Sequence, residues 1–469
     1  MALFNPSKEH NLYSESLAPV DYNKRKVKPF GYGVIWFGMA VQITVFATFA
    51  QMVNFFTIGE LLWIYILGSI LMAIVTLFAQ DIGLRHGVSF ATSISASFGY
   101  LGGKVAGIIR IAPSLIFFGV NAYMGAVAIN EITKMLFNFD HIWFAIILNV
   151  IALVAVTLKG VKGIERFCTF IAPLLLVVGV YMMYVLLNAY DVSFMDTLSM
   201  GKLGDTTKPW LFGMAVVVGG YASVAMGMND FTKDCKVGPE VCQKSWVKSN
   251  WKYFLAAMIG IVPFLVFFTI LGNVAIVLSG RTDVLVLINE LIMGKSFVLA
   301  IVIQLFIVVA QLSTNTAANL LPSAYVVCSL APKKINFKVA TIGFAALACV
   351  AQPWSYSSQL STILSVFSAT AGPAMAIIAV DYFVFRKRNL SFADLFNSHG
   401  KYTYWKGYNI PAMLVYVIVT GLSLALSFDY SFFIGTVLGA VAYYLCAKPF
   451  AKIYPVTVTE DALPPVYED

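Results

Sequence analysis

Charged side chains are scarce in this sequence. Asp, Glu, Lys and Arg make up 12% of the 469 residues, roughly half the share that soluble globular domains carry. Hydrophobic types reach 59%, more apolar surface than a water-soluble fold of this size can cover with so few charges. The same apolar content excludes a disordered chain. The composition therefore predicts an integral membrane protein whose main partner is the lipid bilayer.

Cysteine and histidine are also sparse and scattered. The six cysteines form no C-x-x-C pair and no cluster with the four histidines, so we expect neither a disulfide framework nor a zinc site. The stretch 1–16 is polar and lacks the apolar core of a cleaved signal peptide, so the first span is expected to direct insertion. The net charge of +8 does not indicate nucleic-acid binding, because the basic residues lie in short loops between apolar runs.

Twelve apolar segments are long enough, or nearly so, to cross a bilayer core of about 30 Å as helices. They cover residues 30–56, 61–84, 105–136, 141–158, 164–189, 210–228, 253–278, 296–330, 338–354, 360–385, 408–428 and 430–446. If the N-terminus is inside, 26 of the 31 Lys and Arg residues fall on the inner side and five on the outer side. This asymmetry predicts an all-α, multi-pass protein of the plasma membrane with both termini in the cytoplasm.

The middle of each predicted span is free of Asp, Glu, Lys, Arg and His. Proton-driven carriers usually need a titratable group in the pathway, and charged substrates usually need a fixed counter-charge. We therefore expect a neutral substrate, with any coupling cation held by hydroxyl and carbonyl oxygens, as suits Na⁺. An intramembrane enzyme is disfavoured, because His, Asp and Cys residues do not converge on a common point.

Glycines and polar residues interrupt the first and sixth spans. The first span has Gly38 and Gln42 in an apolar run, and the sixth has Gly219 and Gly220 before Tyr221. Glycine pairs weaken a helix, and interrupted helices at corresponding positions of two halves indicate an inverted-repeat transporter. Close helix packing through small residues explains the glycines alone about equally well.

The third and eighth spans carry the other polar groups. Phe117 and Asn121 share a face of the third span, which suits a flat polar heterocycle, although such a pair taken alone is more often packing. The eighth span packs six polar residues into nine positions: Gln311, Ser313, Thr314, Asn315, Thr316 and Asn319. Hydrogen bonding between helices explains one or two of them, so the run as a whole is expected to face a cavity or an ion.

These residues resemble the nucleobase–cation symporter-1 family, in the bacterial branch that includes hydantoin, allantoin and uracil carriers. The matching motifs are NLYSESLAPV (11–20), IWFGMAVQI (35–43), RHGVSFATSISASFG (85–99), NDFTK (229–233), STNTAAN (313–319), DYFVFRKRNLSFADLF (381–396) and GKYTYWKGYN (400–409). The resemblance covers nearly the whole chain and implies a LeuT-type fold of two inverted five-helix repeats plus two further helices. The implied parts are a cytoplasmic tail (1–29), the first repeat (30–189), the second repeat (209–385), the last two helices (408–447) and a second tail (448–469).

The resemblance also implies binding residues. For substrate these are Gln42, Phe117, Asn121, Gly220, Tyr221, Asn315 and Asn319; for Na⁺ they are the carbonyls of Gly38, Val41 and Ala310 and the hydroxyls of Ser313 and Thr314. Characterised hydantoin carriers have Trp where this chain has Phe117 and Tyr221, and Gln in place of Asn121. Ring stacking survives these changes, but the particular substrate does not carry over.

The expected function is secondary active import of a small, neutral, planar nitrogen heterocycle, such as a nucleobase, allantoin or a hydantoin, by symport with Na⁺. Proton-coupled uptake of a nucleobase or a vitamin ring is the first alternative. An amino-acid carrier of the same fold is disfavoured, because the chain shows no clear site for a carboxylate. A channel or a non-transporting receptor is the alternative from another class. No cofactor is expected beyond the coupling ion, and the oligomeric state stays open.

Overall fold

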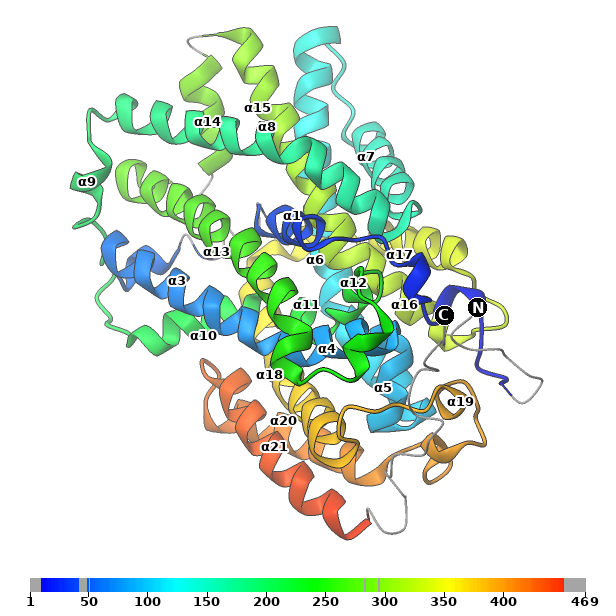
Figure 1. The fold of residues 1–469 in the computed structure, drawn as a ribbon. Helices are drawn as coiled ribbons and strands as arrows, with labels where there is room; N and C mark the ends of the chain where they lie inside the picture. The colour runs from blue at the N-terminus through cyan, green and yellow to red at the C-terminus, as the bar shows by residue number, and fades with distance from the viewer. Residues whose placement is uncertain (1–9, 42–48, 50, 282–283, 294–295, 451–469) are drawn as a thin grey trace.

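The computed structural model describes residues 10–41, 49, 51–281, 284–293 and 296–450 (Figure 1). Apart from three isolated β-bridges, the regular structure in these ranges is helical. The all-α prediction is therefore confirmed.

The apolar helices follow one another along the chain, and their bounds are close to the predicted spans except for α1, which ends at Ala40 although the predicted first span reaches residue 56. They are α1 (Pro29–Ala40), α3 (Ile58–Val75) with α4 (Leu77–His86), α6 (Tyr100–Phe137), α7 (Ile142–Thr157), α8 (Gly160–Ala189), α10 (Trp210–Gly220) with α11 (Ala222–Met226), α13 (Trp246–Ser279), α15 (Phe297–Thr314) with the π-helix η5 (Asn315–Leu320) and α16 (Leu321–Leu330), α17 (Phe337–Ala351), α18 (Leu360–Ala379) with the π-helix η7 (Val380–Phe385), α20 (Ile410–Leu426) and α21 (Ser431–Phe450).

Shorter helices fill the connections. They are η1 (Glu15–Leu17), η2 (Tyr22–Lys24), η3 (Gln51–Asn54), α5 (Phe90–Phe98), α9 (Phe194–Thr197), α12 (Asn229–Thr232), η4 (Pro239–Cys242), α14 (Val284–Met293), η6 (Pro353–Gln359), α19 (Phe392–Leu395) and η8 (Lys401–Thr403).

Within the described ranges, seven helices are long and apolar enough to cross a membrane, and four more are apolar but shorter. With α1, which stops at Ala40, they number twelve and correspond one to one with the predicted spans. The repeat boundaries at 30–189 and 209–385 stay predictions. The predicted tails lie partly outside the described residues, at 1–9 and 451–469.

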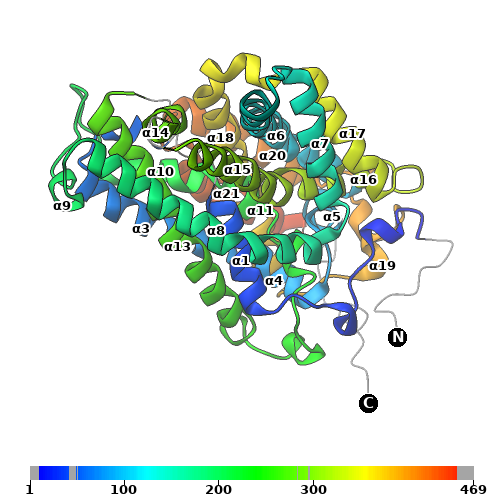
Figure 2. The same cartoon turned by 90° about the horizontal axis from the view of Figure 1, so that it is seen from above.

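The broken helices occupy the interior of the bundle. Helix α1 lies between α8 and α13 and also packs on α15 and η5 (Figures 1 and 2). Helix α6 packs along α15 and η5, and also contacts α11 and α18. The last two helices, α20 and α21, pack on the outer side of α18, where Figure 1 shows them in orange and red. This arrangement brings the end of α1 next to the polar run of α15 and η5, and it brings Tyr221, which follows α10, next to the end of α1.

Both predicted helix interruptions are present. The residue after α1, Val41, has φ −82° and ψ 62°, which ends the helix. Between α10 and α11, Tyr221 has φ −109° and ψ 5°, so the sixth span breaks directly after Gly220. Backbone groups at both breaks are left without helical partners, and such groups in a membrane must bind side chains, ions or ligands.

Candidate functional site

Uncharged oxygens from α1 and α15 converge at the end of α1. The Thr314 hydroxyl donates to the carbonyls of Gly38 at 2.7 Å and Val41 at 3.0 Å. The Ser313 hydroxyl donates to the Ala310 carbonyl at 2.8 Å and reaches the Gly38 carbonyl at 3.5 Å. The structure thus brings all five residues of the predicted Na⁺ set together. Ion binding by this group, which we call the oxygen cluster, stays a prediction.

A glycine makes the close approach of these helices possible. A Cβ atom on Gly38 would lie 2.7 Å from the Cys168 sulfur of α8 and 3.5 Å from the Cβ of Ser313. Any larger residue would push α1 away from α8 or α15. The Gly38 carbonyl stays within reach of both hydroxyls because residue 38 has no side chain.

The eighth span changes its helical pitch at the cluster. Directly after Thr314 the chain forms the π-helix η5, and short π segments inside α-helices are frequent at functional sites. The Asn315 amide donates to the Phe118 carbonyl of α6 at 2.9 Å, and the Asn319 amide donates to the Asn315 side-chain oxygen at 2.8 Å. The two asparagines therefore form a chain of hydrogen bonds that joins η5 to α6.

The Asn121 amide is buried without any hydrogen bond. Its residue is 0% exposed, and neither its nitrogen nor its oxygen has a partner in the described part of the chain. Leaving such an amide unpaired costs about 1–3 kcal/mol, so a buried unpaired amide indicates a group that completes its hydrogen bonds. Phe117, one helical turn earlier on α6, is half-buried, and a flat ligand on this face would meet both residues.

A second buried amide faces the same helix from α15. The Gln311 side chain is 0% exposed, its nitrogen lies 3.7 Å from the Met124 sulfur of α6, and its oxygen has no partner among the described residues. The binding set predicted from sequence omits Gln311, although the polar run in which it lies is visible there. Two buried amides, Asn121 of α6 and Gln311 of α15, therefore keep free hydrogen-bonding capacity among the described residues.

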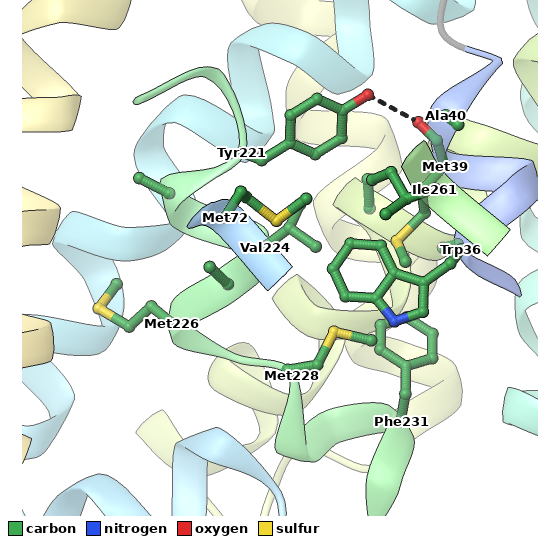
Figure 3. Packing of buried hydrophobic residues seen from close by; sticks show 14 of the residues in the cluster. Trp36, Met39, Ala40, Met72, Tyr221, Val224, Met226, Met228, Phe231 and Ile261 are labelled. Carbon is green, nitrogen blue, oxygen red and sulfur yellow. Dashed lines mark hydrogen bonds between the residues drawn. The ribbon is translucent and has the colours of Figure 1, made fainter. Parts of the chain in front are cut away.

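Tyr221 joins the two helix breaks. Its ring is 2% exposed, and its hydroxyl donates to the Met39 carbonyl at 3.2 Å (Figure 3). Met39 directly follows Gly38, so Tyr221 touches the helix that supplies the oxygen cluster. Figure 3 shows the tyrosine among apolar side chains of the core, including Met72 and Ile261.

Phe49 lies against the break of the sixth span. A Cβ on Gly220 would sit 3.1 Å from the Phe49 ring, and this ring stacks on Tyr65 at a centroid distance of 6.0 Å. Asn273 donates to the Phe49 carbonyl at 3.1 Å, which holds this residue in place. Sequence reasoning does not identify Phe49, because nothing local marks one phenylalanine among 37.

The second half of the broken sixth span is anchored by a buried ion pair. Arg110 of α6 contacts Asp230 at 3.2 Å, with the two side chains 3% and 0% exposed. The same guanidinium donates to the Ser223 carbonyl of α11 at 3.1 Å and lies over the Phe90 ring. A Cβ on Gly227 would collide with it, so this glycine opens the path for the arginine.

The predicted site is therefore partly assembled in the described residues. Around the two helix breaks lie the oxygen cluster, Asn315, Asn319, Tyr221 and Gly220. The neighbouring helix α6 carries Phe117 and Asn121. No ring contact joins Phe117 and Tyr221 in the part of the chain that the structure covers, so stacking of a substrate between them stays a prediction. Gln42 lies outside the described residues.

The protein is a bundle of apolar helices, two of which are interrupted. Amides, hydroxyls and backbone carbonyls gather at the two breaks. These features define a secondary transporter rather than an enzyme. The comparisons with known proteins agree. The chain belongs to the family of permeases for cytosine/purines, uracil, thiamine and allantoin, whose sequence model matches residues 19–447. The resemblance seen in the sequence motifs is thereby confirmed.

Individual relatives match over nearly their full length. The chain is 32% identical to the hydantoin permease of Microbacterium maritypicum, over 97% of this chain and 94% of the relative. It is 25% identical to the allantoin permease of Bacillus subtilis, over 94% of each chain. Among solved structures it is similar to Mhp1, a nucleobase–cation-symport-1 family transporter in a closed conformation with bromovinylhydantoin bound, with a TM-score of 0.91 and 32% identity over 96% of this chain and 98% of that one.

Proposed function

We propose that the protein imports a small, neutral, planar nitrogen heterocycle of the hydantoin, allantoin or nucleobase class by symport with Na⁺. The named relatives are permeases for hydantoin and allantoin, and Mhp1 binds a hydantoin. Rings of this class present N–H donors and C=O acceptors in one plane. They match amide side chains, which offer one acceptor and two donor hydrogens.

The observation that carries this proposal is the Asn121 amide. An amide buried with both polar atoms unpaired is unfavourable, and a ligand that pairs with both atoms recovers the lost hydrogen bonds. A cyclic ureide or a nucleobase edge offers an adjacent donor and acceptor for that purpose. The half-buried Phe117 ring on the same helix face adds an apolar plane.

The oxygen cluster supports the proposed coupling to Na⁺. In the structure the Thr314 and Ser313 hydroxyls donate their hydrogens to α1 and α15 carbonyls. With Na⁺ present, the hydroxyls would turn their lone pairs to the ion, and carbonyls and hydroxyls would share it. The ion then holds α1 against α15. If substrate binds the state with these helices together, each ligand raises the affinity for the other.

The first test separates substrate class from coupling ion. Purified protein is screened by thermal shift against hydantoins, allantoin, uracil, cytosine and hypoxanthine, each with Na⁺ or with choline. A ligand that binds the folded state raises the melting temperature. We expect a planar ring to raise it more with Na⁺. Equal shifts in choline, together with uptake into proteoliposomes that needs a pH gradient, would instead support the proton-coupled alternative.

Asn121→Leu tests the amide directly. Leucine has a similar volume and removes an unpaired polar group, so the ligand-free protein should melt at an equal or higher temperature. The loss of two substrate hydrogen bonds should weaken binding roughly 10- to 100-fold. Asn149→Leu is the control. This asparagine is also fully buried, and it donates to the Ala122 carbonyl from α7. An equal loss of affinity in both variants would contradict the role of Asn121.

Transport itself is distinguished from a channel or a receptor by counterflow. We expect saturable uptake that unlabelled substrate inside proteoliposomes accelerates. We also propose that both termini are cytoplasmic, which the placement of Lys and Arg supports. A reporter fused after the last helix should then be protected in intact cells and exposed in inverted vesicles.

A further inference from the structure

A strongly basic pocket lies beside the start of α1 and α13. It has a volume of about 770 Å³. Its basic lining residues are Arg25, Lys26, Lys28, Lys236, Lys244, Lys248 and Lys252, and its one carboxylate is Glu240. Lys244 pairs with Glu240 at 3.3 Å, and within the described chain it is the one lysine of this pocket with an ion-pair partner. Arg25 has Asp234 as an acidic neighbour, and the structure shows no ion pair for the other lysines of the pocket in the ranges that it describes.

The side chains behind these lysines include Arg25 and Tyr22. They are held in place, and neither carries a negative charge that would offset the charge of the lysines. The Arg25 guanidinium is buried and donates to the carbonyls of Val20 and Leu84. Burial raises the pKa of the Tyr22 phenol, so this ring stays neutral at physiological pH. The pocket therefore presents a cluster of exposed lysines on a preformed floor, which suits an anionic group.

An apolar groove begins where the basic pocket ends. It has a volume of about 620 Å³ and runs between α1, α8 and α13. Its walls include Phe30, which is 74% exposed, and Ile259, which is 62% exposed. Gly33 and Gly260 also line it, and a Cβ on Gly260 would lie 2.0 Å from the Gly33 carbonyl oxygen, so α1 and α13 touch through their backbones there.

The pocket and the groove are continuous. Pro29 and Lys252 line both of them. Along α13 the groove extends from Lys252 to Phe264, which corresponds to about 18 Å at 1.5 Å per residue. One leaflet of the hydrocarbon core is about 15 Å thick, half of the full core. The groove therefore has the depth of one leaflet, and its lysine end lies at the level of the lipid headgroups.

We propose that this combined site binds one anionic phospholipid, with its phosphate among Lys28, Lys248 and Lys252 and one acyl chain in the groove. Zwitterionic lipids fit less well, because the only carboxylate of the pocket is already paired and offers no partner for a choline or ethanolamine ammonium. A soluble phosphate would use the pocket but leave the groove unfilled. The continuity of the two favours a lipid over a free anion.

A lipid bound at this site would affect the transporter through the position of α1. The acyl chain would pack on the outer face of the helix whose other end supplies the Gly38 and Val41 carbonyls. A lipid in the groove favours the position of α1 that forms it. Lipid binding does not depend on the proposed substrate, so the two proposals can fail separately.

The test uses the full-length protein in detergent with added phosphatidylglycerol, phosphatidylcholine or glycerol phosphate. Native mass spectrometry counts bound lipid, and thermal shift measures stabilisation. The charge variant carries Lys28→Gln, Lys248→Gln and Lys252→Gln. Its control carries Lys333→Gln, Lys334→Gln and Lys338→Gln, which removes the same charge from exposed residues around the start of α17. A groove variant, Ala172→Phe, fills the α8 wall and keeps every lysine.

We expect one tightly retained phosphatidylglycerol and a larger rise in melting temperature than phosphatidylcholine gives. The charge variant should bind it roughly tenfold or more weakly, while the control triple variant retains it. The Ala172→Phe variant should also lose retention, and the melting temperature without lipid reports whether each variant is folded. Equal binding of both lipids, equal loss in the control, or full stabilisation by glycerol phosphate alone would overturn the proposal.

Discussion

The Thr314 hydroxyl oxygen lies 2.7 Å from the carbonyl oxygen of Gly38. The two residues are 276 positions apart and belong to the two halves of the chain that are predicted to form inverted repeats. The contact places an uncharged oxygen of the second half on the broken helix of the first. A cation bound to both oxygens, with the hydroxyl hydrogen turned away from the carbonyl, would hold both halves at once.

The first prediction concerns this hydroxyl. Thr314→Val keeps the shape of the side chain and removes its oxygen. We expect the Na⁺ concentration that half-saturates substrate binding to rise about tenfold or more, because one ion ligand is lost. The measurement is a Na⁺ titration of substrate-dependent thermal shift or tryptophan fluorescence.

Thr316→Val is the matched control for Thr314→Val. The Thr316 hydroxyl is equally buried, but it donates to the Leu312 and Ser313 carbonyls of its own helix. Its loss should leave the Na⁺ dependence within about twofold of the parent protein. If the two valine variants shift the titration equally, the oxygen cluster is not the ion site.

The second prediction concerns the close approach of α1 to α8. A Cβ on Gly38 would lie 2.7 Å from the Cys168 sulfur, so Gly38→Ala should displace α1 and weaken Na⁺-dependent binding. Removing the sulfur relieves the collision, since the next atoms lie at 3.5 Å or more. Gly38→Ala with Cys168→Ala should therefore recover part of the binding. No recovery in the double variant would show that the glycine has another role.

The third prediction separates the ring of Tyr221 from its hydroxyl. Tyr221→Phe removes the hydrogen bond to the Met39 carbonyl and keeps the ring. It should cost about 1 kcal/mol of stability and change substrate affinity less than Tyr221→Ala does. If stacking holds the substrate, Tyr221→Ala and Phe117→Ala should weaken binding far more than Leu115→Ala. The comparison is made by substrate titration of the four purified variants.

A fourth prediction concerns pH. The proposed binding groups, which are the oxygen cluster and the Asn121 amide of α6, are hydroxyls, an amide and backbone carbonyls, which do not titrate near neutrality. Substrate affinity at saturating Na⁺ should therefore stay constant between about pH 6 and pH 8. A binding curve with an apparent pKa in this window would point to a proton as the coupling ion.

Much of the fold follows from the sequence because the bilayer imposes a simple length rule. The apolar runs give the spans, and the Gly219–Gly220 pair marks the break that the structure places at Tyr221. Ser313 and Thr314 stand out in the sequence because polar residues in a membrane helix need partners, and the family resemblance implies the carbonyls of Gly38, Val41 and Ala310 as their companions. The five residues of the oxygen cluster come together in the described structure.

Other features depend on contacts between distant segments. The π-helix η5 has no local signature in the sequence, and in the structure it packs against α6, α7 and α1. The Phe49 ring reaches Gly220 across 171 positions of sequence, so only the fold shows the contact. Asn121 is visible as a polar residue in a span, but its lack of a partner is a property of the surrounding helices.

The last prediction concerns the ion pair between Arg110 and Asp230. Both side chains are buried, and the pair holds α6 against α11 and α12. Arg110→Met leaves a buried carboxylate that keeps the Phe90 backbone N–H at 2.9 Å and the nearby charge of Lys233, but loses its ion-pair partner. Such a loss costs about 3–5 kcal/mol, so a large fall in melting temperature is expected.

Neutralising the partner should reverse most of that fall. Arg110→Met with Asp230→Asn removes the unpaired charge and keeps a side-chain oxygen for the Phe90 N–H, so the double variant should melt well above the single one. Lys208→Met breaks the ion pair with Asp429, whose side chains are 32% and 37% exposed, and should cost less than about 1 kcal/mol. Substrate binding then distinguishes a structural pair from one that positions α11. If the double variant is stable but binds substrate weakly, the arginine acts by holding the Ser223 carbonyl, and with it the second half of the broken helix, in place.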